Sequence, residues 1–227
     1  MPEVSAADVI EYLSEYLTDR RKSLIEKVLD QRTRHITIVL EDIYKPQNAS
    51  AVLRTAECQG VQDLYIIENE HLYDVNPDVV KGASKWLTLH KYPKNGGNNT
   101  ALCFKDLREK GYRIICTDPR GTRSIEQLEI QQRIALVFGT EYTGLSDQAR
   151  DGADELVSIP MHGFTESYNL SVSAAICLQS LTSRMRNAEI DWGLTADEKQ
   201  QLKLLWYKGQ VRDADAMINR HFDKVVG

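Results

Sequence analysis

The first group of residues that could do chemistry joins a polar loop to a helix. Residues 45–48 read Lys-Pro-Gln-Asn, and the helix predicted after them carries Arg54. The neighbours of Arg54 on that helix are Val52, Leu53 and Ala56. Burying an unpaired guanidinium among such apolar residues would be costly. Asn48 and Arg54 point about 120° apart on a helix. Arg54 therefore either forms a surface salt bridge or is aimed at a phosphate or a reacting hydroxyl.

The second group is a loop with two glycines at residues 137–146, Val-Phe-Gly-Thr-Glu-Tyr-Thr-Gly-Leu-Ser. Its G-x-x-x-x-G spacing resembles a P-loop, but Leu-Ser stands where that motif requires Lys-Ser or Lys-Thr. No G-x-G-x-x-G follows a predicted strand, so a standard dinucleotide loop is also unsupported. Gly139 and Gly144 still permit a ligand to approach the backbone closely, with Glu141 as a nearby acceptor. The loop is either such a cradle or a plain strand-to-helix turn.

The third group, residues 158–175, runs from a strand through Pro160 and a polar loop into a helix capped near Ser167 or Asn169. Small residues in the first turns would let this helix pack close to another element; they are Ser171, Ser173, Ala174 and Ala175. His162 is weak evidence for a catalytic base. The chain has no G-x-S-x-G and no obvious pairing of a nucleophile with a base.

An alternation of strand and helix patterns predicts the scaffold that positions these loops. The predicted strands are residues 35–40, 64–67, 86–90, 112–116, 134–138 and 155–159. The predicted helices are one capped by Asn48 and ending at Gly60, one at 100–110 and one at roughly 169–187. This order indicates an α/β fold with a mostly parallel sheet covered by helices on both faces. Ligand sites in such sheets gather beyond the carboxyl ends of the strands.

Both ends of the chain have helical patterns instead. Residues 5–31 have apolar positions at helical spacing, and Thr195-Ala-Asp-Glu198 is a capping-box sequence that opens another helix. A further helix is expected around residues 210–223. We therefore expect an N-terminal extension at 1–34, a core at 35–188 and a C-terminal extension at 189–227.

The composition excludes several classes of protein. The chain has 227 residues, of which 42% are hydrophobic and 27% charged, and this is not the composition of a disordered chain. It lacks an apolar run long enough to span a membrane, and its acidic start does not resemble a signal peptide, so a cytoplasmic location is expected. Its cysteines are Cys58, Cys103, Cys116 and Cys177. This wide spacing favours buried thiols over a zinc site or disulfides.

The charge is unevenly distributed along the chain. The net charge is −5, yet residues 19–34 and residues 199–224 each carry six basic against three acidic side chains, a net +3. Because binding depends on where charge lies, these two segments keep nucleic acid possible as a partner.

Taken in order, the three groups resemble the three motifs of the SpoU/TrmH-type RNA 2′-O-ribose methyltransferases of the SPOUT superfamily. The first motif is carried by Asn48, Ala51, Arg54 and Thr55, and the second by Gly139, Glu141, Gly144 and Leu145. The third is Ile159-Pro-Met161 followed by Ser167-Tyr-Asn-Leu-Ser-Val-Ser-Ala-Ala175. The match spans most of residues 35–188.

The resemblance implies a fold and a cofactor. In this family the C-terminal part of the core threads through a loop to form a trefoil knot, and the knot loops hold S-adenosylmethionine. The cofactor-binding residues carried over by motif are Thr117, Gly139, Thr140, Ile159, Met161, Tyr168 and Asn169. Tyr168 is a departure, because the family usually has Leu at that position.

The resemblance also assigns catalytic roles. Arg54 matches the family's catalytic arginine. Because a free guanidinium is a poor base, we expect it to lower the pKa of the ribose 2′-hydroxyl and to hold an adjacent phosphate. Asn48, Glu141, Ser167 and Asn169 are expected to orient the arginine, the ribose and the methyl donor. No metal is needed.

The implied partners are a second copy of the chain and tRNA. The helix after the third motif would pack on its mate in a homodimer, and the basic ends resemble those of the tRNA-acting branch. The expected RNA-binding residues are Arg20, Arg21, Lys22, Arg32, Arg34, Lys203 and Lys208. A guanosine in the D-loop is the expected target. The alternatives are methylation of ribosomal RNA, or a non-catalytic RNA-binding protein on the same scaffold.

Overall fold

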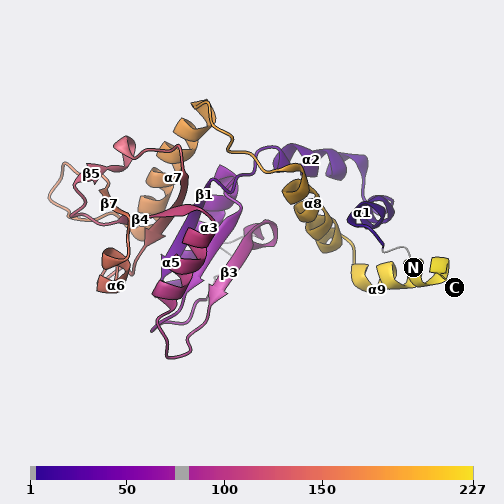
Figure 1. The fold of residues 1–227 in the computed structure, drawn as a ribbon, viewed down its shortest axis with the longest axis horizontal. Helices are drawn as coiled ribbons and strands as arrows, with labels where there is room; N and C mark the ends of the chain where they lie inside the picture. The colour runs from indigo at the N-terminus through magenta and orange to yellow at the C-terminus, as the bar shows by residue number, and fades with distance from the viewer. Residues whose placement is uncertain (1–3, 75–81, 227) are drawn as a thin grey trace. The chain divides into compact units, whose positions relative to one another are not determined.

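The computed structural model describes residues 4–74 and 82–226, without the side chains of residues 223–226. The chain divides into two compact units (Figure 1). One is the core, Thr33–Trp192, and the other combines the two ends of the chain, Met1–Arg32 with Gly193–Gly227. No helix in the described part is long and apolar enough to cross a membrane.

The core is built on a seven-stranded sheet in which every neighbouring pair is parallel. The strand order is β3-β2-β1-β6-β4-β7-β5. The strands are β1 (Ile36–Glu41), β2 (Asp63–Ile67), β3 (Thr88–Tyr92), β4 (Tyr112–Thr117), β5 (Arg123–Ser124), β6 (Arg133–Phe138) and β7 (Glu155–Ser158). The prediction of a mostly parallel α/β sheet is confirmed.

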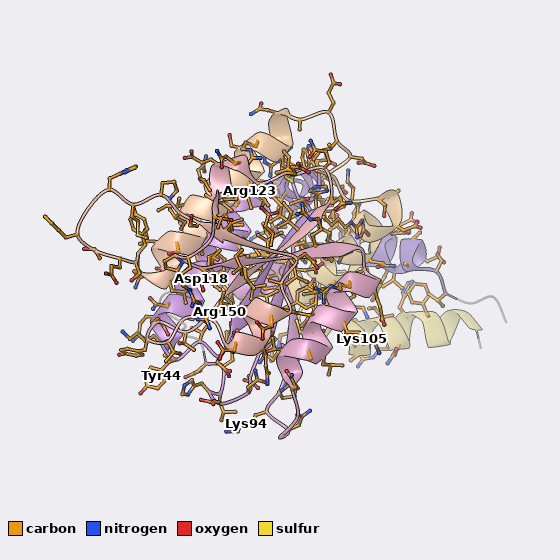
Figure 2. All side chains as sticks on the ribbon, turned by 60° about the vertical axis from the view of Figure 1, so that its left-hand side comes forward. Tyr44, Lys94, Lys105, Asp118, Arg123 and Arg150 are labelled. Atoms are coloured by element: carbon orange, nitrogen blue, oxygen red, sulfur yellow. The ribbon has the colours of Figure 1, made fainter. Side chains whose placement is uncertain are left out.

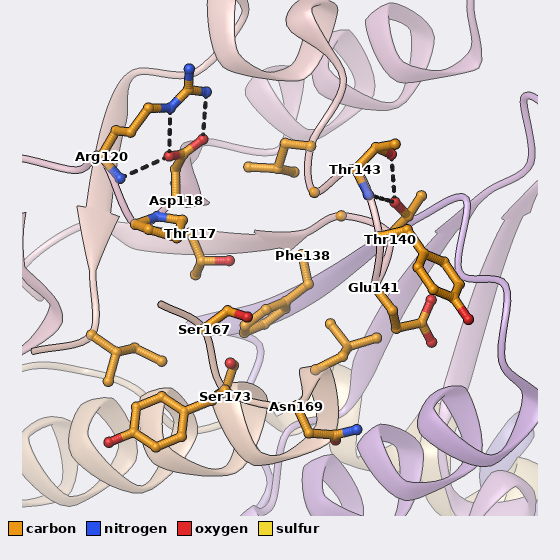
Figure 3. A pocket seen from close by; sticks show the side chains of 18 of the residues that line it. Thr117, Asp118, Arg120, Phe138, Thr140, Glu141, Thr143, Ser167, Asn169 and Ser173 are labelled. Atoms are coloured by element: carbon orange, nitrogen blue, oxygen red, sulfur yellow. Dashed lines mark hydrogen bonds and ion pairs between the residues drawn. The ribbon is translucent and has the colours of Figure 1, made fainter. Parts of the chain in front are cut away.

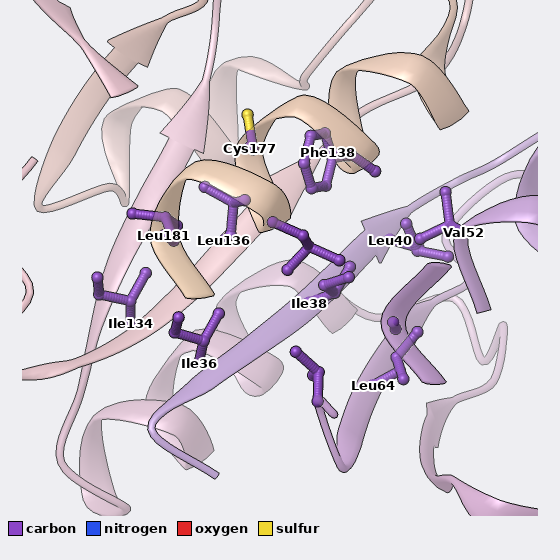
Figure 4. Packing of buried hydrophobic residues seen from close by; sticks show 14 of the residues in the cluster. Ile36, Ile38, Leu40, Val52, Leu64, Ile134, Leu136, Phe138, Cys177 and Leu181 are labelled. Carbon is purple, nitrogen blue, oxygen red and sulfur yellow. The ribbon is translucent and has the colours of Figure 1, made fainter. Parts of the chain in front are cut away.

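Helices cover both faces of this sheet because its central strands are apolar on both sides. All six residues of β1 are buried. Ile36, Ile38 and Leu40 pack in one cluster with residues of α3 (Pro46–Gln59) and α7 (Leu170–Asn187), as Figure 4 shows. Val39 lies in a second cluster with residues of α5 (Asn99–Glu109). The two clusters are the cores of the two helical layers.

Several short elements of the core differ from the sequence prediction. Trp86, which begins the predicted third strand, is instead the last residue of a 3₁₀ helix, η1 (Ala83–Trp86), and β3 starts at Thr88. Three further short elements had no sequence signal of their own: β5, the 3₁₀ helix η2 (Ile125–Gln127) and α6 (Asp147–Asp151).

The prediction that Asn48 caps α3 is wrong. The helix is capped three residues earlier, with Lys45 as its N-cap and Pro46 in the first turn. Proline suits that position because its missing N–H would have no partner there. The Asn48 side chain is therefore available for contacts outside the helix. The predicted cap of α7 is confirmed at Asn169, whose side chain accepts a hydrogen bond from the Ser171 backbone.

The terminal unit consists of helices from both ends of the chain. They are α1 (Ala6–Ser14), α2 (Asp19–Leu29), α8 (Ala196–Gln210) and α9 (Ala214–Val226). The capping box at Thr195 is confirmed, whereas the continuous helix expected over 5–31 is interrupted before Thr18, which caps α2. Helix α8 contacts α1, α2 and α9. The two ends therefore form one unit and not two separate extensions.

Trp206 lies at the centre of this terminal unit. Its side chain is 2% exposed, and the guanidinium carbon of Arg32 lies 5.4 Å from the centroid of its ring. Arg32 itself is only 1% exposed. The expectation that Arg32 contacts RNA is therefore wrong, because its charge is buried in a cation–π contact.

Replacing Trp206 by alanine is expected to lower the free energy of unfolding of the terminal unit by about 3–5 kcal/mol, because a buried aromatic side chain is removed. The adjacent Leu205 is 54% exposed, so Leu205→Ala is the matched control and should change stability by less than about 0.5 kcal/mol. Urea unfolding followed by circular dichroism measures both. Equal losses for the two variants would show that Trp206 does not hold the unit together.

The cysteines largely follow the prediction of buried thiols. Cys103, Cys116 and Cys177 are buried, whereas Cys58 is exposed on α3. Burial raises the pKa of the Cys177 thiol to about 12, so this group stays protonated and unreactive at neutral pH.

Candidate active site

A cavity of about 600 Å³ lies at the carboxyl ends of β4, β6 and β7. Three chain segments form its walls: residues after β4, the loop after β6, and the segment that leads from β7 into α7. Figure 3 shows Thr117 and Asp118 on one side, Thr140 and Glu141 on another, and Ser167 and Asn169 at the start of α7. This is the edge at which parallel sheets bind ligands.

The loop after β6 is closed on itself by its own backbone. The Thr140 N–H donates to the Gly144 carbonyl over 2.9 Å, and the Gly144 N–H donates back to Thr140 over 3.1 Å. Gly144 has a φ of 71°, which favours glycine. A Cβ at Gly139 would lie 2.3 Å from the carbonyl carbon and oxygen of Gly144. The two glycines predicted to form a cradle therefore allow this tight closure.

A series of side-chain hydrogen bonds connects the three sequence motifs to one another. The Asn48 Nδ2 donates to Glu141 Oε1 over 2.7 Å, and the Asn169 Nδ2 donates to Asn48 Oδ1 over 3.2 Å. Asn169 Oδ1 in turn accepts from the Ser171 hydroxyl over 2.7 Å. Glu141 also accepts from the backbone N–H of Lys45 over 3.3 Å. Side chains that are 121 residues apart in the sequence are thus fixed relative to one another.

The cavity collects most of the residues that the sequence analysis selected. All seven expected cofactor-binding residues line it: Thr117, Gly139, Thr140, Ile159, Met161, Tyr168 and Asn169. Of the expected catalytic residues, Glu141 and Ser167 also line it, and Asn48 reaches it through its hydrogen bonds to Glu141 and Asn169.

Arg54 is the predicted catalytic residue that neither lines the cavity of its own chain nor forms a hydrogen bond to a residue that does. It lies on α3 with an exposed side chain. Asn48 points at Glu141, and a residue six positions further along a helix points about 120° away and lies about 9 Å along the axis. The guanidinium makes no hydrogen bond or ion pair with the part of the chain that is described. The surface salt bridge that the sequence left open is therefore not formed with any residue that the structure describes.

Comparison with known proteins identifies the family. A sequence model of the SpoU rRNA Methylase family matches residues 35–179, which is more than half of the chain. The chain belongs to the SpoU rRNA methylase family. A tRNA (guanosine(18)-2′-O)-methyltransferase of Borreliella burgdorferi is 43% identical over 203 residues, covering 88% of this chain and 90% of that protein.

Solved structures agree with this SpoU-family assignment in their fold. A TrmH/SpoU tRNA modifying enzyme of A. aeolicus matches with a TM-score of 0.75 at 23% identity, covering 85% of this chain and 98% of that chain. The SpoU methyltransferase AviRb of Streptomyces viridochromogenes, solved in complex with the cofactor AdoMet, gives a TM-score of 0.59 at 22% identity. That match covers 71% of this chain and 65% of that chain. The predicted family and fold are confirmed, and the trefoil knot stays a prediction.

The SpoU-family cavity also contains a charged cluster that the sequence analysis missed. Asp118 is 5% exposed and accepts hydrogen bonds from Arg120 Nε over 3.0 Å and from Arg150 Nε over 2.9 Å. The hydrogen bonds from Arg120, with further contributions from Arg150, hold the pKa of Asp118 well below its ordinary value. The available signal was the Asp-Pro-Arg sequence one residue beyond the predicted strand at 112–116.

This low pKa makes the free energy of unfolding of the core decrease at acidic pH. Asp118 titrates near pH 4 when unfolded and lower when folded, so its contribution is present above about pH 4 and is lost as the pH falls further. Asp118→Asn should lower the free energy of unfolding at pH 7 by about 1–3 kcal/mol and flatten its pH dependence below pH 4. Urea unfolding between pH 7 and pH 3 measures both effects.

Asp147→Asn is the matched control, because Asp147 pairs with the same Arg150 at 2.9 Å but its side chain is 95% exposed. Its loss should be below about 1 kcal/mol. The same pH profile for wild type and Asp118→Asn would contradict the role given to Asp118.

Some of the basic residues expected to bind RNA form ion pairs with carboxylates of the same chain, and others do not. Lys22 pairs with Asp19, Arg34 with Asp63, Lys203 with Glu26 and Lys208 with Asp215. Arg20 and Arg21 are exposed on α2, and their guanidinium groups have no partner among the described residues. These two cations are the ones most available to an external phosphate.

Proposed function

We propose that this protein transfers a methyl group from S-adenosylmethionine to the ribose 2′-oxygen of a guanosine in tRNA, most simply in the D-loop. The observation that carries the proposal is the line of hydrogen bonds Glu141–Asn48–Asn169 beside the cavity. A tRNA substrate is supported by the activity for which the B. burgdorferi relative is named. Such a substrate would place the protein in the cytoplasm.

The cavity has the size and chemistry that S-adenosylmethionine requires. Its volume of about 600 Å³ lies within the usual range for small-molecule sites. Phe138, Leu145 and Ile159 supply apolar surface for the adenosine, and backbone groups of the closed loop supply polar contacts. Arg120 and Arg150, which already pair with Asp118, also line the cavity and are the cations nearest to a bound carboxylate. When bound, the cofactor supplies an electrophilic methyl group on a positively charged sulfur.

The chain's own groups align the reaction. The 2′-oxygen attacks the methyl carbon as the carbon–sulfur bond breaks, and alignment of these atoms supplies much of the rate. Asn48, Glu141, Ser167 and Asn169 would fix the ribose and the methyl donor. Arg54 would stabilise the developing negative charge on the oxygen and hold an adjacent phosphate, which can accept the proton.

A homodimer would explain the position of Arg54. The cavity of one chain lacks this residue, so an arginine from the partner's α3 would complete it. The helix that would form the contact is α7, which carries the small residues of the third motif and an exposed Val172. Close packing of such small residues suits a two-fold contact.

The terminal unit would hold the RNA. Arg20 and Arg21 can bind phosphates without first breaking an ion pair, whereas Lys22, Lys203 and Lys208 would exchange a carboxylate for a phosphate. Arg34, which belongs to the core, would make the same exchange. Binding of this kind weakens as salt concentration rises. The family is named for methylation of rRNA, so ribosomal RNA is the second candidate substrate.

The decisive experiment incubates the purified protein with labelled S-adenosylmethionine and total RNA, and then maps the 2′-O-methylated nucleotide. Label in a D-loop guanosine of tRNA is the expected result. Label found only in ribosomal RNA would show that ribosomal RNA, and not tRNA, is the substrate. Cofactor binding without any transfer would support the non-catalytic alternative.

A further inference from the structure

A second cavity of about 520 Å³ lies on the other side of the glycine loop. Thr140, Tyr142, Thr143 and Gly144 line both cavities, so this loop is their common wall. The remaining walls of the second cavity come from the end of β1 and the residues after it, from residues that follow β2, and from Ser146. None of the sequence motifs predicts a ligand here.

Exposed aromatic rings surround this second cavity. Tyr44 is 58% exposed and Tyr142 is 74% exposed, although both side chains are large and apolar over most of their surface. Their ring centroids lie 6.3 Å apart with an angle of 66° between the planes. The ring centroid of His71 lies 5.3 Å from that of Tyr44. Figure 2 shows Tyr44 at the surface of the core. Open aromatic faces of this kind are the surfaces on which proteins stack unpaired RNA bases.

These rings are directly connected to the proposed reacting centre. The Tyr44 backbone N–H donates to Glu141 Oε2 over 3.4 Å, and Tyr142 is the residue after Glu141. The Lys45 Nζ lies 5.1 Å from the centroid of the Tyr142 ring. A nucleoside whose ribose lies at Glu141 would therefore have its base within reach of Tyr44 and Tyr142.

The acidic side chains in the second cavity differ in whether they already accept hydrogen bonds. Glu41 already accepts hydrogen bonds from Thr100 and Ser146. Asp42 accepts from three successive backbone N–H groups that follow β2. The carboxylate of Glu70 makes no hydrogen bond or ion pair within the described ranges. It is the acceptor left open in this cavity.

We propose that the second cavity receives the base of the nucleoside that is methylated. Tyr44 stacks on the face of the base, and Tyr142, whose ring plane is inclined by 66° to that of Tyr44, contacts the edge of the base. The Glu70 carboxylate accepts hydrogen bonds from guanine N1–H and N2–H. Guanine presents these two donors side by side, whereas adenine presents an acceptor at N1, so Glu70 selects guanosine. This inference rests on the proposed function and adds the residues that choose the base.

The test uses tRNA transcripts that differ only at the methylated position, carrying guanosine or inosine, which lacks the 2-amino group. Tyr44→Ala should lower kcat/KM for the guanosine transcript by about 10-fold or more, with Tyr44→Phe near wild type. Glu70→Gln should lower kcat/KM for guanosine about 10-fold and remove the preference over inosine. Leu72→Ala is the control, since Leu72 is 74% exposed and lies outside the cavity.

Calorimetric titration with S-adenosylmethionine separates the possible failures. Each variant should bind the cofactor within twofold of wild type. Transfer by Tyr44→Ala and Tyr142→Ala at the wild-type rate would overturn the role given to the two rings. A wild-type guanosine preference in Glu70→Gln would overturn the selection role. A wild-type protein that methylates no RNA would instead overturn the proposed function, and this inference with it.

Discussion

Replacing Arg54 by alanine is expected to lower kcat for methyl transfer by about 10²–10⁴-fold. The Kd for S-adenosylmethionine should stay within about twofold, because Arg54 does not line the cavity of its own chain. The physical reason is that charge develops on the 2′-oxygen only in the transition state, so a cation placed there acts on the rate. Single-turnover assays with tRNA and calorimetric titration with the cofactor measure the two quantities separately.

The control for this prediction lies on the same helix. Cys58 is exposed one turn beyond Arg54, and Cys58→Ala should leave kcat unchanged. Arg54→Lys keeps the charge but loses the paired donors of the guanidinium, and it should recover only part of the rate. Unchanged turnover in Arg54→Ala would contradict the catalytic assignment.

A mixture of two inactive variants can show where Arg54 acts. Arg54→Ala and Asn169→Ala should each be inactive, but a mixed dimer would contain one intact site if Arg54 serves the partner's cavity. Random mixing then restores about a quarter of wild-type activity. No recovery after confirmed subunit exchange would place both residues in the same site of one chain.

The second large effect is expected at Gly139. A Cβ at this position would lie 2.3 Å from the carbonyl group of Gly144 and 2.4 Å from the Leu145 nitrogen. Backbone atoms cannot turn aside as a flexible side chain can, so Gly139→Ala should force the closed loop open. An overpacking cost of about 1–3 kcal/mol converts to cofactor affinity about 5–150-fold weaker. Calorimetric titration with S-adenosylmethionine measures this loss.

Gly163→Ala is the matched control for the glycine prediction. Gly163 lies in the loop before α7, and a Cβ there would have no atom within 4 Å. The substitution should leave cofactor affinity within about twofold of wild type. If both variants bind equally well, the closure between Gly139 and Gly144 is not needed for the cofactor.

The sheet was predictable because its central strands are short apolar runs bounded by helices. Residues 35–40 and 134–138 have no polar alternation, which indicates strands covered on both faces, and β1 and β6 are such strands. β5 and α6 were not predictable, since two and five residues are too few to show a period. The long N-terminal helix was overestimated because its apolar spacing continues past the break before Thr18.

The site was predictable as three loops, because parallel strands bring their carboxyl ends to one edge. The partners of individual side chains were not predictable. Asn48 was assigned to a cap because asparagine favours caps, but Pro46 starts the helix and leaves its amide for Glu141. Arg32 was assigned to RNA by charge alone, and only the fold shows that it lies against Trp206.

The joining of both chain ends in one unit has a consequence for synthesis. A ribosome produces α1 and α2 before the core, whereas their partner α8 is made only after it. The apolar side chains of Leu13, Ile25 and Leu29 therefore lack their final neighbours until the core has been translated. The core is expected to fold before the N-terminal helices dock, which reverses the usual order of folding during translation. A stalled nascent chain that ends near Trp192 would expose these residues to chaperones and proteases.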